Sequence, residues 1–456
     1  MSFDRSSIQV SMVTLGCSKN LVDAERMVSI LKNAGYSIVN NQSESDVVII
    51  NTCGFIEDAK KEAIDAILDA GDIKADDNTK LQKIIVSGCL PQRYSGDILS
   101  EMPEVDIVMG TSHYHDILEA VDSLFENESF ANEYVSKAGG IDLYNPDVIN
   151  ERVVSTTGYA WLKIAEGCLH KCAFCAIPLI RGKYISRKME DIINEARSLV
   201  ENGYKEIILA AQDTTNYGID LYKKRMLASL LHELGQIDGL EVIRVMYGYM
   251  DGMDDDLIEE IATNSKVANY LDIPIQHGEN RVLRSMFRGD TAELITDRIN
   301  KLRERIPNVI LRTTVMVGFP GETEEEFQVM KSNLAKWKFD RLGCFIFSPE
   351  EGTKAFDMDD QIDDETKQRR YDEIYALQQK ISTESNKNRV GEEVDVTIDS
   401  VSDDGIFYIG RSYGEAPEVD PAIYVAATNE EGLIIGNRYK VRIIDSSEYE
   451  MTGVTI

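Results

Sequence analysis

Hydrophobic residues open the chain in three short runs, and each run ends at a cysteine. The runs are QVSMVTLGC to Cys17, DVVIINTC to Cys53 and KIIVSGC to Cys89, so each cysteine follows the previous one by 36 positions. Helical patterns such as AERMVSILKNAG fill the gaps. This spacing is typical of β-α-β units and predicts an N-terminal parallel α/β domain over 1–130. Because parallel strands end at one edge of a sheet, we expect the three cysteines to converge there.

A second series of strand and helix patterns follows a mixed polar stretch, 131–157, which we interpret as a linker. Its six candidate strands lie at 160–165, 206–211, 241–247, 270–275, 309–317 and 341–347. Helical runs such as MEDIINEARSLVENG separate them. Six such repeats predict a partial (β/α)6 barrel of the TIM type over 158–388, with its chemistry at the C-terminal ends of the strands.

The last part of the chain changes to short alternating strands with glycine turns. Residues 389–456 therefore predict a small all-β barrel. From Asp395 onward this barrel carries 12 acidic and 4 basic side chains, and the whole chain has a net charge of −31. The charge argues against a partner bound mainly through its phosphates and favours a basic protein. An acidic surface that serves only solubility is the alternative.

Cysteine use depends on the compartment of the protein. No apolar run approaches the roughly 20 residues of a membrane span. The first residues, MSFDRSSIQV, have neither a basic nor an apolar leader region, so we expect a cytoplasmic protein. In that compartment the seven cysteines stay reduced, and clustered thiols are more often metal ligands or catalysts than bridges.

The motif EGCLHKCAFCAIP directly follows the first strand of the second series. Its cysteines, Cys168, Cys172 and Cys175, have the spacing C-x3-C-x2-C. Three thiolates on one loop can hold three irons of a [4Fe–4S] cluster and leave the fourth iron open to a substrate. Zinc is the alternative, but it usually takes a fourth Cys or His from a second motif, and His170 has the wrong spacing.

At these residues the chain resembles the radical S-adenosylmethionine superfamily, whose signature is this spacing with an aromatic residue, here Phe174, before the last cysteine. The resemblance implies a partial barrel and an open iron that binds S-adenosylmethionine, whose reductive cleavage yields a carbon radical. Over nearly the whole chain it extends to the methylthiotransferases, which have a three-cysteine N-terminal domain, a radical barrel and a C-terminal TRAM barrel.

Membership of the methylthiotransferases would give the first three cysteines a role. The resemblance implies that Cys17, Cys53 and Cys89 hold a second, auxiliary [4Fe–4S] cluster. It also implies that one S-adenosylmethionine donates a methyl group and a second supplies the radical. The alternative is that these cysteines are small buried residues at strand ends.

Several segments resemble the branch that modifies the β-carbon of an aspartate in the twelfth protein of the small ribosomal subunit. They are LGCSKNLVDAE, AIPLIRGKYISR, AAQDTTNYG, DIPIQHG and GRSYGEAPEVD. The alternative substrate is a modified adenosine in transfer RNA, for which the first segment would resemble YGCQMN. The acidic TRAM barrel favours a basic ribosomal protein, bound through that barrel, over nucleic acid.

The resemblance also implies partners other than the substrate. These are an electron donor that reduces the clusters and a sulfur donor. The sulfur atom comes either from the auxiliary cluster itself or from a sulfide attached to it. A module that only stores a metal or cluster is the alternative from outside enzymology, but storage does not need an open iron site.

The remaining site candidates have weaker sequence support. The candidates for contact with S-adenosylmethionine are Phe174, Gln212, Arg312 and Gly318, and those for the substrate carboxylate are Arg181 and Lys183. All except Phe174 have an ordinary alternative: a hydrogen-bonded core residue for Gln212 and Arg312, a turn for Gly318, and a solvated loop for Arg181 and Lys183. No catalytic side chain is expected beyond the cluster ligands.

Overall fold

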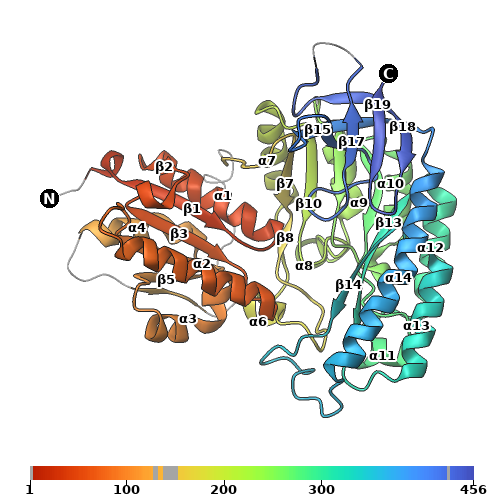
Figure 1. Ribbon diagram of the computed structural model, residues 1–456, viewed down its shortest axis with the longest axis horizontal. Helices are drawn as coiled ribbons and strands as arrows, with labels where there is room; N and C mark the ends of the chain where they lie inside the picture. Colours follow the sequence, from red (N-terminus) through yellow and green to blue (C-terminus); the bar gives the residue numbers. More distant parts are fainter. Residues whose placement is uncertain (1–3, 127–131, 137–151, 429–431) are drawn as a thin grey trace. The chain divides into compact units, whose positions relative to one another are not determined.

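The computed structural model describes residues 4–126, 132–136, 152–428 and 432–456 (Figure 1). Internal contacts divide the chain into two compact units. Unit 1 contains residues 1–155, 165–187 and 350–356, and unit 2 contains 156–164, 188–349 and 357–456. Most of the predicted linker 131–157 lies outside the described residues, and the domain boundaries at 130, 157 and 388 stay predictions.

Unit 1 contains a six-stranded parallel sheet. Its strands are β1 (Gln9–Thr14), β2 (Ser37–Val39), β3 (Val47–Thr52), β4 (Lys83–Gly88), β5 (Ile107–Gly110) and β6 (Glu133–Tyr134), in the order β2-β1-β3-β4-β5-β6. Apolar residues cover both faces of the sheet. Helices α1 (Ser18–Asn33) and α4 (Ile117–Glu126) pack on one face, and α2 (Glu57–Ala75) and α3 (Cys89–Glu101) pack on the other. The predicted parallel α/β domain is confirmed, and the fully buried β3 has the continuous apolar run of a central parallel strand.

Two later stretches of the chain complete unit 1. The first contains the short antiparallel strands β8 (Ala165–Glu166) and β9 (Ile185–Ser186), with α6 (Ile177–Ile180) between them. The second is the segment 350–356. The β8–β9 pair closes the base of the loop that carries Cys168, Cys172 and Cys175.

Unit 2 contains a second parallel sheet of six strands. They are β7 (Tyr159–Lys163), β10 (Glu206–Ala210), β11 (Val242–Val245), β12 (Val267–Asp272), β13 (Ile310–Val317) and β14 (Arg341–Ile346), in the order β14-β13-β12-β11-β10-β7. The helices between them are α7 (Met189–Glu201), α8 (Ile219–Tyr222), α9 (Leu227–Gly235), α10 (Asp255–Thr263), α11 (Asn280–Ser285), α12 (Ala292–Arg305) and α13 (Glu324–Trp337). The six predicted strands all form, which confirms the partial barrel.

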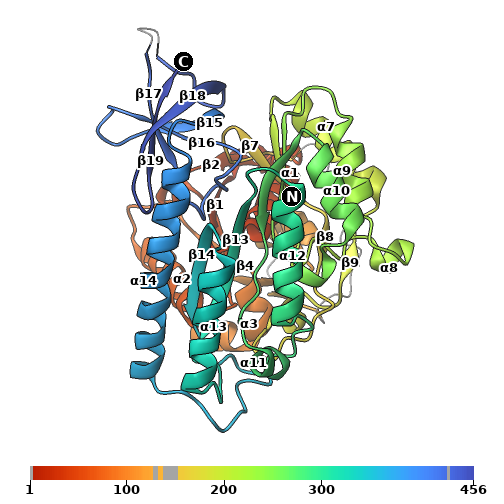
Figure 2. The same cartoon turned by 90° about the vertical axis from the view of Figure 1, so that its right-hand side faces the viewer.

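The C-terminal part of unit 2 begins with the long helix α14 (Asp364–Asn388), which lies beside α13 (Figure 2). It leads into a closed five-stranded barrel with the strand order β15-β16-β17-β19-β18. The strands are β15 (Glu393–Val401), β16 (Tyr408–Arg411), β17 (Ile423–Ala426), β18 (Arg438–Ser446) and β19 (Met451–Thr455). The predicted small all-β barrel is thus confirmed. Among the described residues, no helix is both long enough and apolar enough to cross a membrane.

Candidate functional site

Cys17, Cys53 and Cys89 lie at the C-terminal edge of the unit 1 sheet. Their strands β1, β3 and β4 are direct neighbours. Cys17 is the N-cap residue of α1, Cys53 directly follows β3, and Cys89 is the first residue of α3. The βα pattern therefore places all three side chains at the crevice where open α/β sheets bind ligands.

Glycines next to the three cysteines allow the turns that carry these cysteines to pack closely together. A Cβ atom at Gly16 would lie 2.6 Å from the Cβ atom of Cys53, and one at Gly54 would lie 3.0 Å from the carbonyl carbon of Cys89. Neither position has room for a methyl group. The turn at Cys17 therefore contacts Cys53, and the turn at Cys53 contacts Cys89.

Gly88 offers a direct test of this packing. Its φ is +101°, and a Cβ atom there would lie 2.5 Å from the carbonyl oxygen of Thr52. Gly35 has a similar φ of +100° but nothing within 4 Å of its Cβ position. We expect Gly88→Ala to lower the free energy of unfolding by about 3 kcal/mol and Gly35→Ala by about 1 kcal/mol, as measured by chemical denaturation. Equal losses in the two variants would contradict the close approach.

The three thiols have different acidities. Burial alone would raise the pKa of Cys17, but the charges of Lys19 and Arg181 and two backbone N–H groups together lower it. Burial raises the pKa of Cys53, and it raises that of Cys89 to about 12. Cys17 is thus the thiol most ready to become a thiolate, the form that binds iron.

Arg181 lies beside this triad. Its Nη2 atom is 3.6 Å from the Sγ atom of Cys89 and donates a hydrogen bond to the side-chain oxygen of Asn20. Its Nη1 atom lies 2.8 Å from a carboxylate oxygen of Asp23 and 3.1 Å from one of Glu166. Both terminal nitrogens of the guanidinium are therefore hydrogen-bonded inside unit 1, a placement that the sequence did not predict.

The second cysteine triad, which consists of Cys168, Cys172 and Cys175, lies on the loop closed by β8 and β9. The backbone N–H of Cys168 donates to the carbonyl of Gly182 at 3.3 Å, and that of Cys175 donates to the carbonyl of Cys172 at 3.1 Å. Cys172 is buried, while the other two cysteines are partly exposed. Phe174 is also partly exposed, and Lys183 is exposed on the same loop.

The loop of the second triad packs against the first triad. Ala176 and Ile180 are fully buried in one apolar cluster with Cys89, and Phe55 packs against it. The hydroxyl of Thr111 donates to the carbonyl of Ile180 at 3.0 Å. The structure therefore brings all six candidate ligands into one compact unit.

Segment 350–356 contacts both cysteine loops. The backbone N–H of Ala355 donates to the carbonyl of Ala173 at 2.8 Å. The buried carboxylate of Glu350 accepts from Lys60 at 3.2 Å and from Arg93 at 3.1 Å. Arg93 in turn donates to the carbonyl of Gly54, next to Cys53, at 2.8 Å. Glu350 is a candidate that sequence reasoning missed, because nothing in the local pattern SPEEGTKAF signals a distant partner.

The candidates for S-adenosylmethionine binding in unit 2 lie near strand ends. Gln212 follows β10 by two residues, and Gly318 directly follows β13. Gly318 has a φ of +74°, and its N–H donates to the carboxylate of Glu322 at 2.6 Å. A Cβ atom there would lie 2.3 Å from the Cγ atom of Lys367. Packing and the turn thus already require this glycine, and its contact with S-adenosylmethionine stays a prediction.

Arg312 is paired within unit 2. Its Nη1 atom lies 2.8 Å from a carboxylate oxygen of Asp272, and its Nε atom lies 3.4 Å from one of Asp420. Tyr270 also donates to Asp420, at 2.5 Å. These ion pairs explain the partial burial of the arginine without a cofactor, so its contact with S-adenosylmethionine also stays a prediction.

Asp420 belongs to GRSYGEAPEVD, residues 410–420, which joins the C-terminal barrel to the parallel sheet of unit 2. Arg411 pairs at 3.0 Å with Glu206, the first residue of β10, and Arg244 donates to the carbonyl of Tyr413 at 2.7 Å. The segment thus contacts the N-terminal end of a strand, whereas the C-terminal ends are where such barrels place their chemistry.

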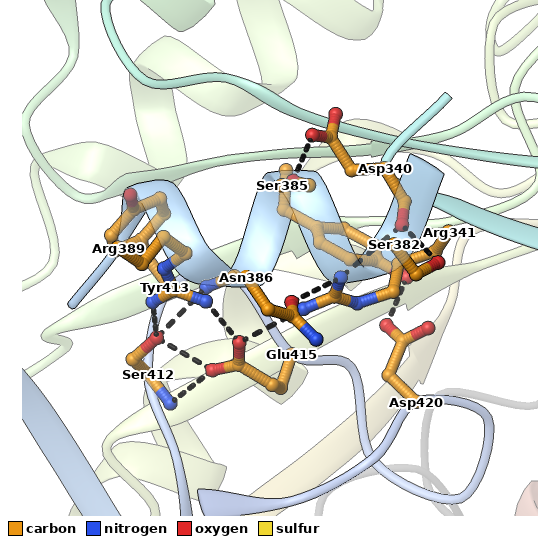
Figure 3. A network of polar contacts seen from close by, with 12 residues as sticks. Asp340, Arg341, Ser382, Ser385, Asn386, Arg389, Ser412, Tyr413, Glu415 and Asp420 are labelled. Atoms are coloured by element: carbon orange, nitrogen blue, oxygen red, sulfur yellow. Dashed lines mark hydrogen bonds and ion pairs between the residues drawn. The ribbon is translucent and has the colours of Figure 1, made fainter. Parts of the chain in front are cut away.

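The centre of this junction is a buried ionic network (Figure 3). Glu415 pairs with Arg389, and it accepts from the N–H and the hydroxyl of Ser412 at 3.0 and 2.6 Å. Arg341 approaches the same carboxylate at 3.6 Å. Burial alone would disfavour the carboxylate, but the two guanidinium groups hold the pKa of Glu415 at about 2. The network therefore fixes the C-terminal barrel to α14 and β14.

Two strained residues lie just past barrel strands. Tyr247 follows β11 with a φ of +60°, and Gln276 follows β12 with a φ of +68°. Positive φ values at non-glycine residues are costly and collect at functional sites. We therefore add both residues to the candidates, since neither residue type signals such a conformation in the sequence.

A site for a single metal ion is the alternative to iron–sulfur clusters at the six cysteines. Among the described residues, no group of three or more His, Cys, Asp or Glu side chains could hold one metal ion. That finding concerns ligands gathered around one atom. In a [4Fe–4S] cluster each thiolate binds a different iron, so the donors are spread more widely.

Three family models match successive parts of the chain. An uncharacterised family, UPF0004, matches residues 9–110, the radical SAM superfamily matches 162–332, and a TRAM domain matches 390–456.

Curated relatives match almost the entire length. One from Caldicellulosiruptor saccharolyticus is 47% identical over 451 residues, covering 98% of this chain and 100% of the relative. One from Thermoanaerobacter sp. is 45% identical over 444 residues, covering 97% and 99%. Both are named ribosomal protein uS12 methylthiotransferase RimO.

Solved structures share the fold. The radical S-adenosylmethionine methyltransferase TsrM from Kitasatospora setae, with cobalamin and a [4Fe–4S] cluster bound, aligns with a TM-score of 0.54 and 12% identity, over 76% of each chain. The cobalamin-dependent enzyme OxsB aligns with a TM-score of 0.51 and 13% identity, over 82% of this chain and 56% of that one. At these identities the likeness concerns the fold alone.

Proposed function

The chain belongs to the family of ribosomal protein uS12 methylthiotransferases, and we propose that it attaches a methylthio group to the β-carbon of an aspartate in that ribosomal protein. The observation that carries this proposal is the gathering of both cysteine triads in unit 1. A radical generator alone would need only one of them. The family match supports this reading and gives no support to the alternative substrate, an adenosine in transfer RNA.

The residues present fit the two [4Fe–4S] clusters and the S-adenosylmethionine that this chemistry requires. We assign Cys168, Cys172 and Cys175 to the cluster with the open iron, and Cys17, Cys53 and Cys89 to the auxiliary cluster. All six donors are thiols, the ligands that hold such clusters. When bound, these groups would supply the carbon radical that removes a hydrogen atom from an unactivated carbon, and the sulfur and methyl group that take the place of that hydrogen.

Residues of unit 1 favour the thiolate form of one proposed ligand and hold the others in place. Cys17 lies at the N-terminus of α1, where the helix dipole favours a thiolate. The closed β8–β9 loop holds the second triad, and Cys172 is buried within it, away from water. Ala176 and Ile180 place an apolar layer beside Cys89.

The substrate and its partners follow from charge and family. We propose that the acidic TRAM barrel attracts the basic ribosomal protein and that the exposed Lys183 meets the substrate carboxylate. The proposed contacts of S-adenosylmethionine are Phe174, Gln212, Arg312 and Gly318. An electron donor and a sulfur donor complete the reaction, which we place in the cytoplasm with the ribosome.

The test is an anaerobic incubation of the reconstituted protein with dithionite, S-adenosylmethionine and ribosomal protein uS12. Mass spectrometry should show a gain of one methylthio group on a single aspartate. A parallel incubation with transfer RNA should show none. Modification of the RNA instead of the protein would refute the proposal.

A storage module would behave differently in the same incubation. It would hold iron and sulfide but release no 5′-deoxyadenosine from S-adenosylmethionine. Release of that product therefore separates the enzyme from a cluster carrier.

A further inference from the structure

We propose that Arg181 is a positioning residue that raises the reduction potential of the auxiliary cluster through a hydrogen bond to the sulfur of Cys89. The inference rests on the proposed function, because it takes Cys17, Cys53 and Cys89 as ligands. Its basis is the 3.6 Å separation between the Nη2 atom of Arg181 and the Sγ atom of Cys89.

The surroundings of the guanidinium fix its direction. Asp23 and Glu166 both bind Nη1, and the side-chain oxygen of Asn20 binds Nη2. The planar fork of arginine can satisfy these partners and the cysteine sulfur at once, whereas a lysine offers a single point of charge. The two carboxylates also compensate a charge that is only 3% exposed.

The partners of Arg181 come from the elements that carry both triads. Asn20 and Asp23 lie in the first turns of α1, directly after Cys17. Glu166 forms part of β8, two residues before Cys168. One guanidinium therefore connects the start of the radical-cluster loop to two of the three turns that carry auxiliary ligands.

This placement argues against the substrate contact that the sequence suggested for Arg181. A substrate carboxylate would have to displace Asp23 or Glu166 from a buried guanidinium. An N–H group that points at a cluster sulfur instead draws electron density from it and favours the reduced cluster. Removal of the bond should therefore make the auxiliary cluster harder to reduce.

The experiment uses the full chain with Cys168, Cys172 and Cys175 replaced by alanine, so that only the auxiliary cluster contributes to the spectrum. In this parent, electron paramagnetic resonance of samples poised at fixed potentials gives the ratio of reduced to oxidised cluster. We expect Arg181→Lys and Arg181→Met to lower this ratio at least tenfold, which corresponds to about 59 mV for a one-electron couple.

The matched control removes another buried arginine of unit 1. Arg152 has a side chain only 1% exposed and lies 3.5 Å from Glu25. Arg152→Met should leave the ratio within twofold of the parent. A ratio within twofold of the parent in Arg181→Lys would overturn the inference, and so would an equal drop in Arg152→Met.

A second measurement needs no stable variant. Pulsed electron paramagnetic resonance of the parent, grown with ¹⁵N-labelled arginine, should show a ¹⁵N coupling to the reduced cluster. Absence of that coupling would overturn the inference while leaving the ligand assignment intact. A parent that binds no cluster would instead refute the ligand assignment of the proposed function, and the inference with it.

Discussion

Replacement of Cys172 by alanine should reduce the release of 5′-deoxyadenosine from S-adenosylmethionine to background. Cys172 is the buried member of the second triad, and its backbone carbonyl also accepts from the N–H of Cys175. Without its thiolate the loop offers only two ligands to a cluster that needs three. Iron in an anaerobic preparation should fall from about eight atoms per chain to about four.

Cys53→Ala is the matched variant at the other triad. It should also lose about four irons, yet it should keep the release of 5′-deoxyadenosine while losing the methylthio product. The two variants thus separate radical formation from sulfur transfer. Persistent 5′-deoxyadenosine release in Cys172→Ala, or its loss in Cys53→Ala, would reject the division of labour between the triads.

The second large effect is a loss of stability, caused by Glu415→Gln, where the C-terminal barrel joins α14 and β14. Glu415→Gln would leave two buried guanidinium groups, those of Arg389 and Arg341, without their shared carboxylate (Figure 3). Breaking a buried pair from one side costs about 3–5 kcal/mol. We expect amide hydrogen exchange in β15–β19 to become roughly 10²- to 10⁴-fold faster, the factor that corresponds to this loss of free energy.

Glu393→Gln is the control for Glu415→Gln. Glu393 pairs with Arg442, but both side chains are 50% exposed, so the loss should stay within about 0.5 kcal/mol. An exchange rate in Glu415→Gln that matches this control would show that the buried network does not hold the barrel.

Acid should reproduce the effect of Glu415→Gln in the unaltered protein. The pKa of Glu415 is lowered to about 2, so its stabilisation is complete above the unfolded value of about 4.5. It is lost as the pH falls from 4.5 through 2, a loss of roughly 3 kcal/mol. The difference in unfolding free energy between the protein and its Glu415→Gln variant should therefore shrink over that range. A constant difference would show that the pKa of Glu415 is not lowered by its arginine partners.

The regular elements were predictable because they depend on local periodicity. Each run that ends at Cys17, Cys53 or Cys89 became a strand, and the helical patterns between them formed the helices of a parallel sheet. Strand-end chemistry follows from such topology, so the cysteines could be placed in advance. The TRAM barrel followed in the same way from alternation and glycine turns.

The long-range ion pairs could not be predicted in this way. The position of Arg181 soon after the cluster motif predicts a substrate contact, but no local pattern could predict its hydrogen bond to Cys89, which is 92 residues away along the chain. The strand position of Arg312 predicts a contact with S-adenosylmethionine, but it could not predict the ion pair with Asp420, which comes from a distant segment of the chain. The partners of such an arginine are carboxylates that the folded chain brings near it from distant positions. The periodicity of the sequence does not show which carboxylates these are.

The return of segment 350–356 to unit 1 also sets the order in which the surroundings of the first triad are made during synthesis. Glu350 holds the Arg93 that supports the turn at Cys53, and Arg181 contacts Cys89. A ribosome makes both residues long after the N-terminal sheet has emerged. The surroundings of the first triad are therefore complete only in a chain that already carries the cysteines of both triads, so iron delivered earlier would meet Cys53 and Cys89 without these contacts.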